Sequence, residues 1–145
     1  MSNYKKKYFY NVFFMTNYPV EICHDLGVFS SIELAKEKIN NTKDLPGYNK
    51  YDSKCFKVIK RCVLCDEYVD KQKIKTLYLL YSEIERDGYT EWRDYGLYYY
   101  KSLANRDLKW ITKHSSYGKK NKNSFIIIKV KINIKTYWSK GFDLL

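Results

Sequence analysis

The first third of the chain alternates between short apolar runs and polar turns, a pattern typical of β-strands. Residues 10–16 include four consecutive apolar side chains and predict a buried strand. Pro19 predicts a turn, and residues 22–29 predict a second strand. The basic run at residues 5–7 predicts an arm that leads into the first strand.

A change to helical spacing follows the second strand. Ser30 and Glu33 form the Ser-x-x-Glu pattern of a capping box, which predicts that a helix begins there. Residues 36–38 would point to solvent, and residues 45–47 (Leu-Pro-Gly) would end the helix. Residues 55–64 predict a third strand. The inward face of the helix would consist of Ile32, Ala35 and Ile39.

The same order of elements returns in the second half of the chain. Residues 77–80 and 91–99 predict two strands, and Asp87-Gly88 predicts a turn between them. Residues 101–113 predict a second helix. Its inward face would consist of Leu103, Ala104, Leu108 and Ile111.

The chain also matches itself at an offset of 69 residues, where residues 26–31 fall on residues 95–100. A duplicated unit predicts two copies of one supersecondary piece that share a core. We therefore predict an α+β fold of two ββαβ repeats, residues 1–72 and 73–145, that together form one compact unit. The sheet would be mostly antiparallel, with one helix per repeat and an approximate two-fold axis.

Three motifs of the chain consist of turn and cap residues: Gly27-Val28-Phe29-Ser30-Ser31, Leu45-Pro46-Gly47-Tyr48 and Trp138-Ser139-Lys140-Gly141-Phe142. They resemble a small uncharacterised domain family of bacteria and phages, in which a Gly-Val-Tyr-Ser-Ser turn opens a helix and Lys-Leu-Pro-Gly-Phe closes it. Members of that family often end with a Trp-x-x-Gly-Phe tail. The second repeat departs from the pattern, since Tyr99-Tyr100 and Ser115-Ser116 replace its cap and its stop. The resemblance implies a fold and suggests no activity.

The charge of the chain narrows its partners. A net charge of +11 and a pI of about 9.4 predict attraction to polyanions, although solubility alone is the simpler explanation. The excess is +3 in residues 1–72 and +8 in residues 73–145. No stretch approaches the ~18 apolar residues of a membrane span. We expect a cytoplasmic protein with no membrane partner.

A basic strand is the first candidate binding surface. Residues 125–137 alternate aliphatic and basic side chains and predict the longest strand, which a polar loop at residues 115–123 would precede. Ile126, Ile128, Val130, Ile132 and Ile134 would share its apolar face. The predicted contact residues are Lys119, Lys120, Lys122, Lys129, Lys131, Lys135 and Tyr137. The alternative is a solvated strand face, or an edge that lysines protect from aggregation.

An aromatic cluster is the second candidate surface. Trp92, Arg93, Tyr98 and Tyr100 would gather at one end of the second helix. Such residues stack on bases and form contact hot spots. The alternative is that these rings cover the sheet.

Catalytic and metal chemistry have little support in the sequence. Cys62 and Cys65 have the spacing of half a zinc site, but a second pair is missing. On a strand the two side chains would face opposite ways, so we expect free thiols and no cofactor. Neither His24 nor His114 has a convincing catalytic partner in the sequence, and no glycine-rich phosphate loop is present. We therefore expect that the protein is not an enzyme.

These features favour a non-enzymatic basic binding module that contacts a nucleic acid or a nucleoprotein. The alternative is a phage-type inhibitor of a bacterial defence nuclease, similar in role to an anti-CRISPR protein. Such an inhibitor would act by protein–protein contact with an acidic or RNA-carrying partner. An enzyme built around Cys62, Cys65 and His24 is the third hypothesis.

Overall fold

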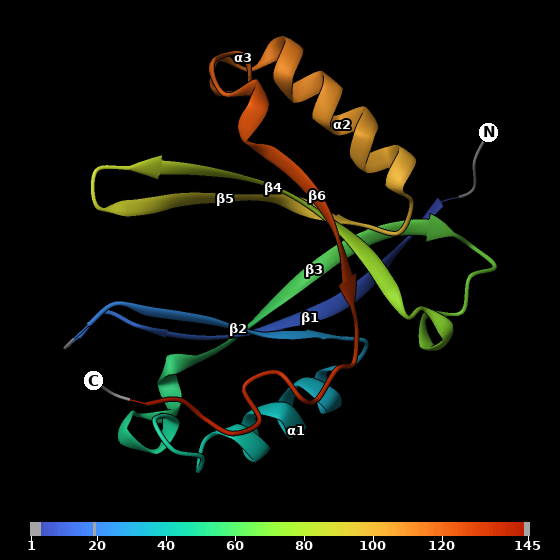
Figure 1. Ribbon diagram of the computed structural model, residues 1–145. Helices are drawn as coiled ribbons and strands as arrows, with labels where there is room; N and C mark the ends of the chain where they lie inside the picture. Colours follow the sequence, from blue (N-terminus) through green and yellow to red (C-terminus); the bar gives the residue numbers. More distant parts are fainter. Residues whose placement is uncertain (1–3, 19, 144–145) are drawn as a thin grey trace. The chain divides into compact units, whose positions relative to one another are not determined.

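The computed structural model describes residues 4–18 and 20–143 and has an α+β fold (Figure 1). It contains two three-stranded antiparallel sheets, with strand orders β2-β1-β3 and β5-β4-β6. The predicted α+β class is confirmed. The elements are β1 (Tyr4–Thr16), β2 (Ile22–Phe29), α1 (Ile32–Thr42), β3 (Phe56–Asp66), β4 (Thr76–Arg86), β5 (Tyr89–Tyr98), α2 (Lys101–His114), α3 (Ser116–Lys120) and β6 (Phe125–Lys131).

Most predicted elements have their counterparts at the expected positions. β2 coincides with the predicted strand, and the Asp87-Gly88 turn joins β4 to β5. The arm predicted at residues 5–7 is wrong, because β1 begins at Tyr4 and includes these lysines. The turn predicted at Pro19 lies outside the described residues.

The chain forms two compact units, and neither of them is a continuous segment. The unit that contains α1 consists of residues 8–62 and 131–145, and the unit that contains α2 consists of residues 1–7 and 63–130. We call them the α1 unit and the α2 unit. The predicted repeat boundary at residues 72 and 73 describes the sequence match and stays a prediction.

Both hairpins carry the same irregularity next to a glycine. The register of β1 and β2 shifts directly after Val12, which pairs with Gly27. The register of β4 and β5 shifts directly after Leu80, which pairs with Gly96. The two glycines have φ angles of 119° and 144°, a region that side chains with a Cβ rarely adopt. They are also the two glycines that align at the offset of 69 residues.

Helix α1 does not begin with the predicted capping box. Its N-cap is Ser31, whose side chain accepts a hydrogen bond from Leu34 N at 3.2 Å. Ser30 is fully buried and serves a contact 103 residues away. Its backbone N–H donates to Asn133 Oδ1 at 2.9 Å, and its Oγ accepts from Asn133 Nδ2 at 3.0 Å. The Ser30–Glu33 capping box is therefore wrong, because tertiary structure uses Ser30 elsewhere.

The prediction that Lys38 points to solvent is also wrong. Lys38 is only 5% exposed, and its Nζ donates to the carbonyl oxygens of Lys135 at 3.0 Å and Tyr137 at 2.5 Å. Burial lowers the pKa of this amino group. The two carbonyls compensate its desolvation, so the lysine ties the segment after β6 to α1.

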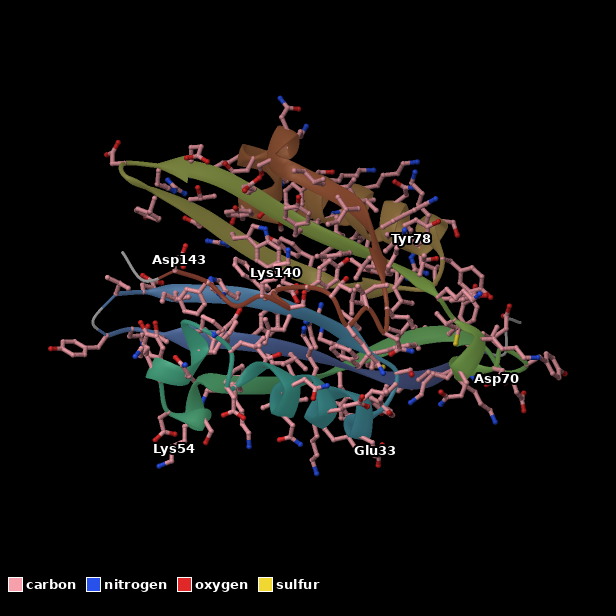
Figure 2. The ribbon with its side chains drawn as sticks, turned by 60° about the horizontal axis from the view of Figure 1, so that its bottom comes forward. Glu33, Lys54, Asp70, Tyr78, Lys140 and Asp143 are labelled. Carbon is pink, nitrogen blue, oxygen red and sulfur yellow. The ribbon has the colours of Figure 1, made fainter. Side chains whose placement is uncertain are left out.

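The predicted strand over residues 125–137 ends early. β6 stops at Lys131, and Asn133 has a φ of 60°, which extended backbone does not allow. The assigned faces also differ, because Ile126 and Ile128 are 37% and 41% exposed whereas Ile132 is buried. Residues 131–143, which we call the C-terminal tail, pack in the α1 unit; Lys140 and Asp143 mark the tail in Figure 2.

The C-terminal tail docks onto the turn that ends α1. Phe142 N donates a hydrogen bond to Pro46 O at 2.9 Å. A Cβ on Gly141 would lie 2.2 Å from that same oxygen, and a Cβ on Gly47 would lie 2.4 Å from Phe142 O. The Leu-Pro-Gly and Trp-x-x-Gly-Phe motifs thus meet in one contact, and only glycine permits the close approach.

Aromatic rings complete this contact. The His24 ring stacks on Trp138 with centroids 3.8 Å apart and an interplanar angle of 10°. His24 Nδ1 hydrogen-bonds to the hydroxyl of Tyr48 at 2.9 Å, and Phe142 packs against the fully buried Tyr48 ring at 4.8 Å. The tail therefore closes the core of the α1 unit. That core contains Val12, Phe14, Leu26, Phe29, Ala35, Tyr48 and Phe56.

Replacing Gly141 by alanine tests the docking contact. Gly141 and Gly88 have φ angles of 76° and 78°, but a Cβ on Gly88 meets no atom within 4 Å. Gly88→Ala should cost only the left-handed strain of about 1 kcal/mol, whereas Gly141→Ala should cost about 3 kcal/mol because backbone must also move. Urea unfolding followed by tryptophan fluorescence measures both. Equal losses would show that the glycine contact does not hold the tail.

His24 predicts sensitivity of the fold to acid. Burial lowers the pKa of His24, so the unfolded chain binds the proton more tightly than the folded one. The contribution to stability is complete above the unfolded pKa of about 6.5 and is lost as the pH falls below it. His24→Gln should flatten the dependence of Tm on pH between about 7 and 5, whereas His114→Gln should not. A wild-type slope in His24→Gln would contradict this assignment.

Candidate nucleic-acid interface

The lysine-bearing segment after α2 is helical, not a loop. Ser115 Oγ accepts a hydrogen bond from Gly118 N at 2.8 Å and caps α3. Gly118 is buried, and a Cβ there would lie 2.1 Å from Ile111 O of α2. The loop predicted at residues 115–123 is therefore wrong, because a serine cap and a close glycine contact fold it onto α2. One 3-10 turn, η4 (Lys122–Ser124), follows α3.

Tyr117 fixes α3 to the hairpin of β4 and β5. Its hydroxyl hydrogen-bonds to the buried Ser82 Oγ at 3.0 Å, and its ring lies 6.1 Å from that of Phe125 on β6. The guanidinium of Arg93 lies 3.7 Å from the centroid of the Tyr117 ring, and Arg93 Nε pairs with Glu91 at 3.0 Å. Arg93, a predicted contact residue, therefore positions α3.

Three predicted lysines lie together beside α3. Lys119, Lys120 and Lys122 are exposed and line one open hollow of about 590 Å³. Glu83 and Glu85 of β4 line the same hollow. The carboxylates weaken the positive potential there, so this hollow alone is a poor polyanion site.

The outward surface of α2 extends the positive charge. Arg106, Lys109 and Lys113 are exposed on the side of α2 opposite the buried Ala104. Trp110 lies among them with 61% of its surface exposed. Sequence analysis missed these residues, although Trp110 interrupts an otherwise polar helix face and that pattern was visible.

Lys129 of β6 belongs to the same side of the α2 unit. It shares a strand face with Phe125, which packs against Tyr117 of α3, and it is exposed. Helices α2 and α3 cover this face of the β5-β4-β6 sheet (Figure 1). We call the exposed cations of this side the basic face; they are Arg106, Lys109, Lys113, Lys119, Lys120, Lys122 and Lys129.

The basic face is largely free of acidic neighbours. Residues 101–130 contain eight Lys and Arg residues and one acidic residue, Asp107. Asp107 is occupied, because it accepts from Tyr98 Oη at 2.7 Å and pairs with Arg106 at 3.3 Å. Within residues 4–18 and 20–143, the six lysines of the basic face form no ion pair. Their charges are therefore available to an anion in solution.

The aromatic residues predicted as a second surface do not join the basic face. Trp92 pairs in register with Glu83 and packs against Tyr81 at 5.1 Å. The Tyr98 hydroxyl is held by Asp107, and the Tyr100 hydroxyl donates to Asp66, which raises the pKa of Tyr100 to about 12. Both tyrosines thus serve internal contacts.

The remaining predicted residues lie at or beyond the end of β6. Lys131 is exposed and is the last residue of β6. Lys135 Nζ pairs with Glu37 at 3.3 Å, and the carbonyls of Lys135 and Tyr137 accept from Lys38. These three residues belong to the α1 unit, whereas the basic face belongs to the α2 unit.

The cysteines and histidines do not form a centre. Cys62 is exposed and Cys65 is buried, as expected for two strand residues on opposite faces, and burial raises the pKa of the Cys65 thiol. Across residues 4–18 and 20–143, no three His, Cys, Asp or Glu side chains are placed to hold a metal ion. In the same part of the chain, the helices are too short or too polar to cross a bilayer.

Comparisons of the chain with protein-family models, with curated proteins and with solved structures found no match. The resemblance to the bacterial and phage domain family therefore stays a prediction. The geometry of the basic face is the basis for a functional proposal.

Replacing Arg93 tests whether the hairpin positions α3. Arg93 and Arg86 are similarly exposed and both pair with Glu91, but only Arg93 lies over Tyr117. A cation–π contact contributes about 0.5–2 kcal/mol, so Arg93→Ala should speed amide exchange in α3 by about 2- to 30-fold. Hydrogen exchange at Lys119 and Asn121, whose amides bond within α3, measures the effect. Arg86→Ala should leave these rates unchanged; an equal effect would remove the special role of Arg93.

Proposed function

We propose that this protein is a non-enzymatic binding module that contacts a nucleic acid, free or within a nucleoprotein, through the basic face. The supporting observation is a set of seven exposed cations on α2, α3, η4 and β6 with a single acidic residue among them, Asp107. Phosphate groups are the polyanion that such a set fits best, because each contact releases condensed counterions.

The distribution of charge within the α2 unit supports one binding side. Residues 76–98, which form β4 and β5, contain five acidic and two basic residues, whereas residues 101–130 carry a net charge of +7. A polyanion approaching this unit is therefore attracted to α2, α3 and β6 and repelled by the hairpin. Trp92 lies in the repelling part, next to Glu83.

The proposal includes the finer architecture and the location. Two ββαβ repeats with approximate two-fold symmetry are supported by the matched glycines and by the register shifts beside them. A location in the cytoplasm, where nucleic acids are accessible, belongs to the same proposal. Membership in the bacterial and phage domain family rests on the three turn and cap motifs.

A protein inhibitor of a nuclease is the second candidate. It is favoured by Trp110 and Arg106, because exposed tryptophan and arginine are the residue types that dominate protein–protein hot spots. A stoichiometric acidic protein partner, together with no nucleic-acid binding at low salt, would support this candidate against the first.

A matched pair of triple variants tests the basic face. Lys109, Lys113 and Lys119 belong to it, whereas Lys36, Lys50 and Lys54 are exposed in the α1 unit. Alanine at the first set should lower the slope of log K against log salt by about 2–3, because each phosphate contact contributes about 0.7–0.9. Alanine at the second set removes the same charge and should leave the slope within about 0.5 of the wild type. Fluorescence anisotropy of a labelled oligonucleotide across ionic strength measures both slopes.

The hollow beside α3 supplies a test of opposite sign. Glu83→Gln together with Glu85→Gln removes two carboxylates that face Lys119 and Lys122 across the hollow. Binding at low salt should become tighter, because the local potential becomes more positive. Absence of binding to both DNA and RNA at low salt in the wild-type protein would refute the proposed function.

A further inference from the structure

The α2 surface points to a more specific ligand than a polyanion. We infer that the basic face takes single-stranded nucleic acid and that Trp110 is the platform on which a base stacks. This inference rests on the proposed function and names the form of nucleic acid that the same site recognises.

Trp110 is poorly explained by packing. It is 61% exposed, more than Trp92 at 45% or Trp138 at 40%, and each of those two rings packs against a neighbour from another strand or segment. Among the described residues, Trp110 has one ring neighbour, His114, with centroids 5.1 Å apart. His114 lies one helical turn away, so most of the indole surface is open to a ligand.

The surroundings of Trp110 are those of a phosphate-bearing ligand. Arg106 and Lys113 lie four residues before and three residues after it, positions that are adjacent to it on a helix surface. Both are exposed, as is Lys109 next to it. A ligand that covers Trp110 must therefore present a flat apolar surface with negative charge on either side of it. A nucleobase between two phosphates meets both requirements.

The indole also discriminates between strands and duplexes. In a duplex the faces of the bases are stacked on one another, so a surface tryptophan meets only the backbone or a groove edge. In a single strand the bases can leave the stack and lie on an aromatic ring. Lysines alone would bind both forms, whereas Trp110 adds free energy only to the single-stranded one.

An acidic protein is the less suitable occupant. Carboxylates would pair with Arg106 and Lys113, but an indole ringed by cations needs an apolar or aromatic group between these carboxylates. A single nucleotide unit supplies ring and charge together. An acidic protein that competes for this surface is one outcome of the test below.

The test compares the intact protein with Trp110→Ala, Trp110→Phe and Trp92→Ala. Fluorescence anisotropy at low salt uses labelled oligothymidylate, oligouridylate and a mixed-sequence DNA duplex of the same length. Trp110→Ala should weaken binding to the two single strands by about 5- to 100-fold, the range that one base–aromatic stack contributes, and change duplex binding less than about twofold. Trp110→Phe should retain most of the single-strand affinity, and Trp92→Ala should retain all of it. The two single-stranded probes separate DNA from RNA.

Each outcome bears on one of the two levels. If Trp110→Ala weakens duplex and single strand equally, or neither, the basic face still binds polyanions but the stacking assignment is wrong. If no probe binds at low salt, the proposed function fails and this inference fails with it. If Trp110→Ala abolishes capture of an acidic protein and leaves single-strand binding intact, the occupant is that protein. An unchanged Tm confirms that Trp110→Ala, at an exposed position, is folded.

Discussion

The close contact between the C-terminal tail and the turn after α1 is the constraint on which the α1 unit depends. Gly141 faces Pro46, Gly47 faces Phe142, and in both places a backbone oxygen occupies the space of a Cβ. Around this contact, burial of aromatic rings supplies the stabilisation and the amino group of Lys38 holds two tail carbonyls. Neither the first 62 residues nor the last 15 can complete the core alone.

This constraint explains why the second repeat departs from the first. The chain has one Leu-Pro-Gly stop and one Trp-x-x-Gly-Phe tail, and these two motifs dock on each other. The segment after α2 has no tail to receive. It carries Ser115-Ser116 in place of Pro46-Gly47, and Ser115 caps a further helix that presents lysines. The same position in the two repeats is thus used for packing in one and for charge in the other.

The functional surface follows from that difference. α3 is short and gains its position from Tyr117, Ser82 and Arg93, so its lysines are exposed on a supported element. Helix α2 adds a polar outer face with one large apolar side chain, Trp110. Cations that are free of acidic partners, together with an uncovered indole, form a surface suited to a ligand that carries phosphate and aromatic groups.

The sequence by itself determined the elements whose signals are local. β2, the turn at Asp87-Gly88 and α2 follow from periodicity and turn residues, and the α+β class follows from their order. Lys119, Lys120, Lys122 and Lys129 were identified as exposed cations because lysine is rarely buried. Tertiary structure decided where a residue answers to a distant partner. Lys38 is buried and Ser30 is not a cap, because the tail supplies their partners about 100 residues later in the chain. The predicted basic strand breaks at Asn133 for the same reason, since its side chain and backbone bond to β2 and Ser30. Hydrogen bonds and close contacts between remote segments leave no periodic trace in a single sequence, so only the folded chain reveals them.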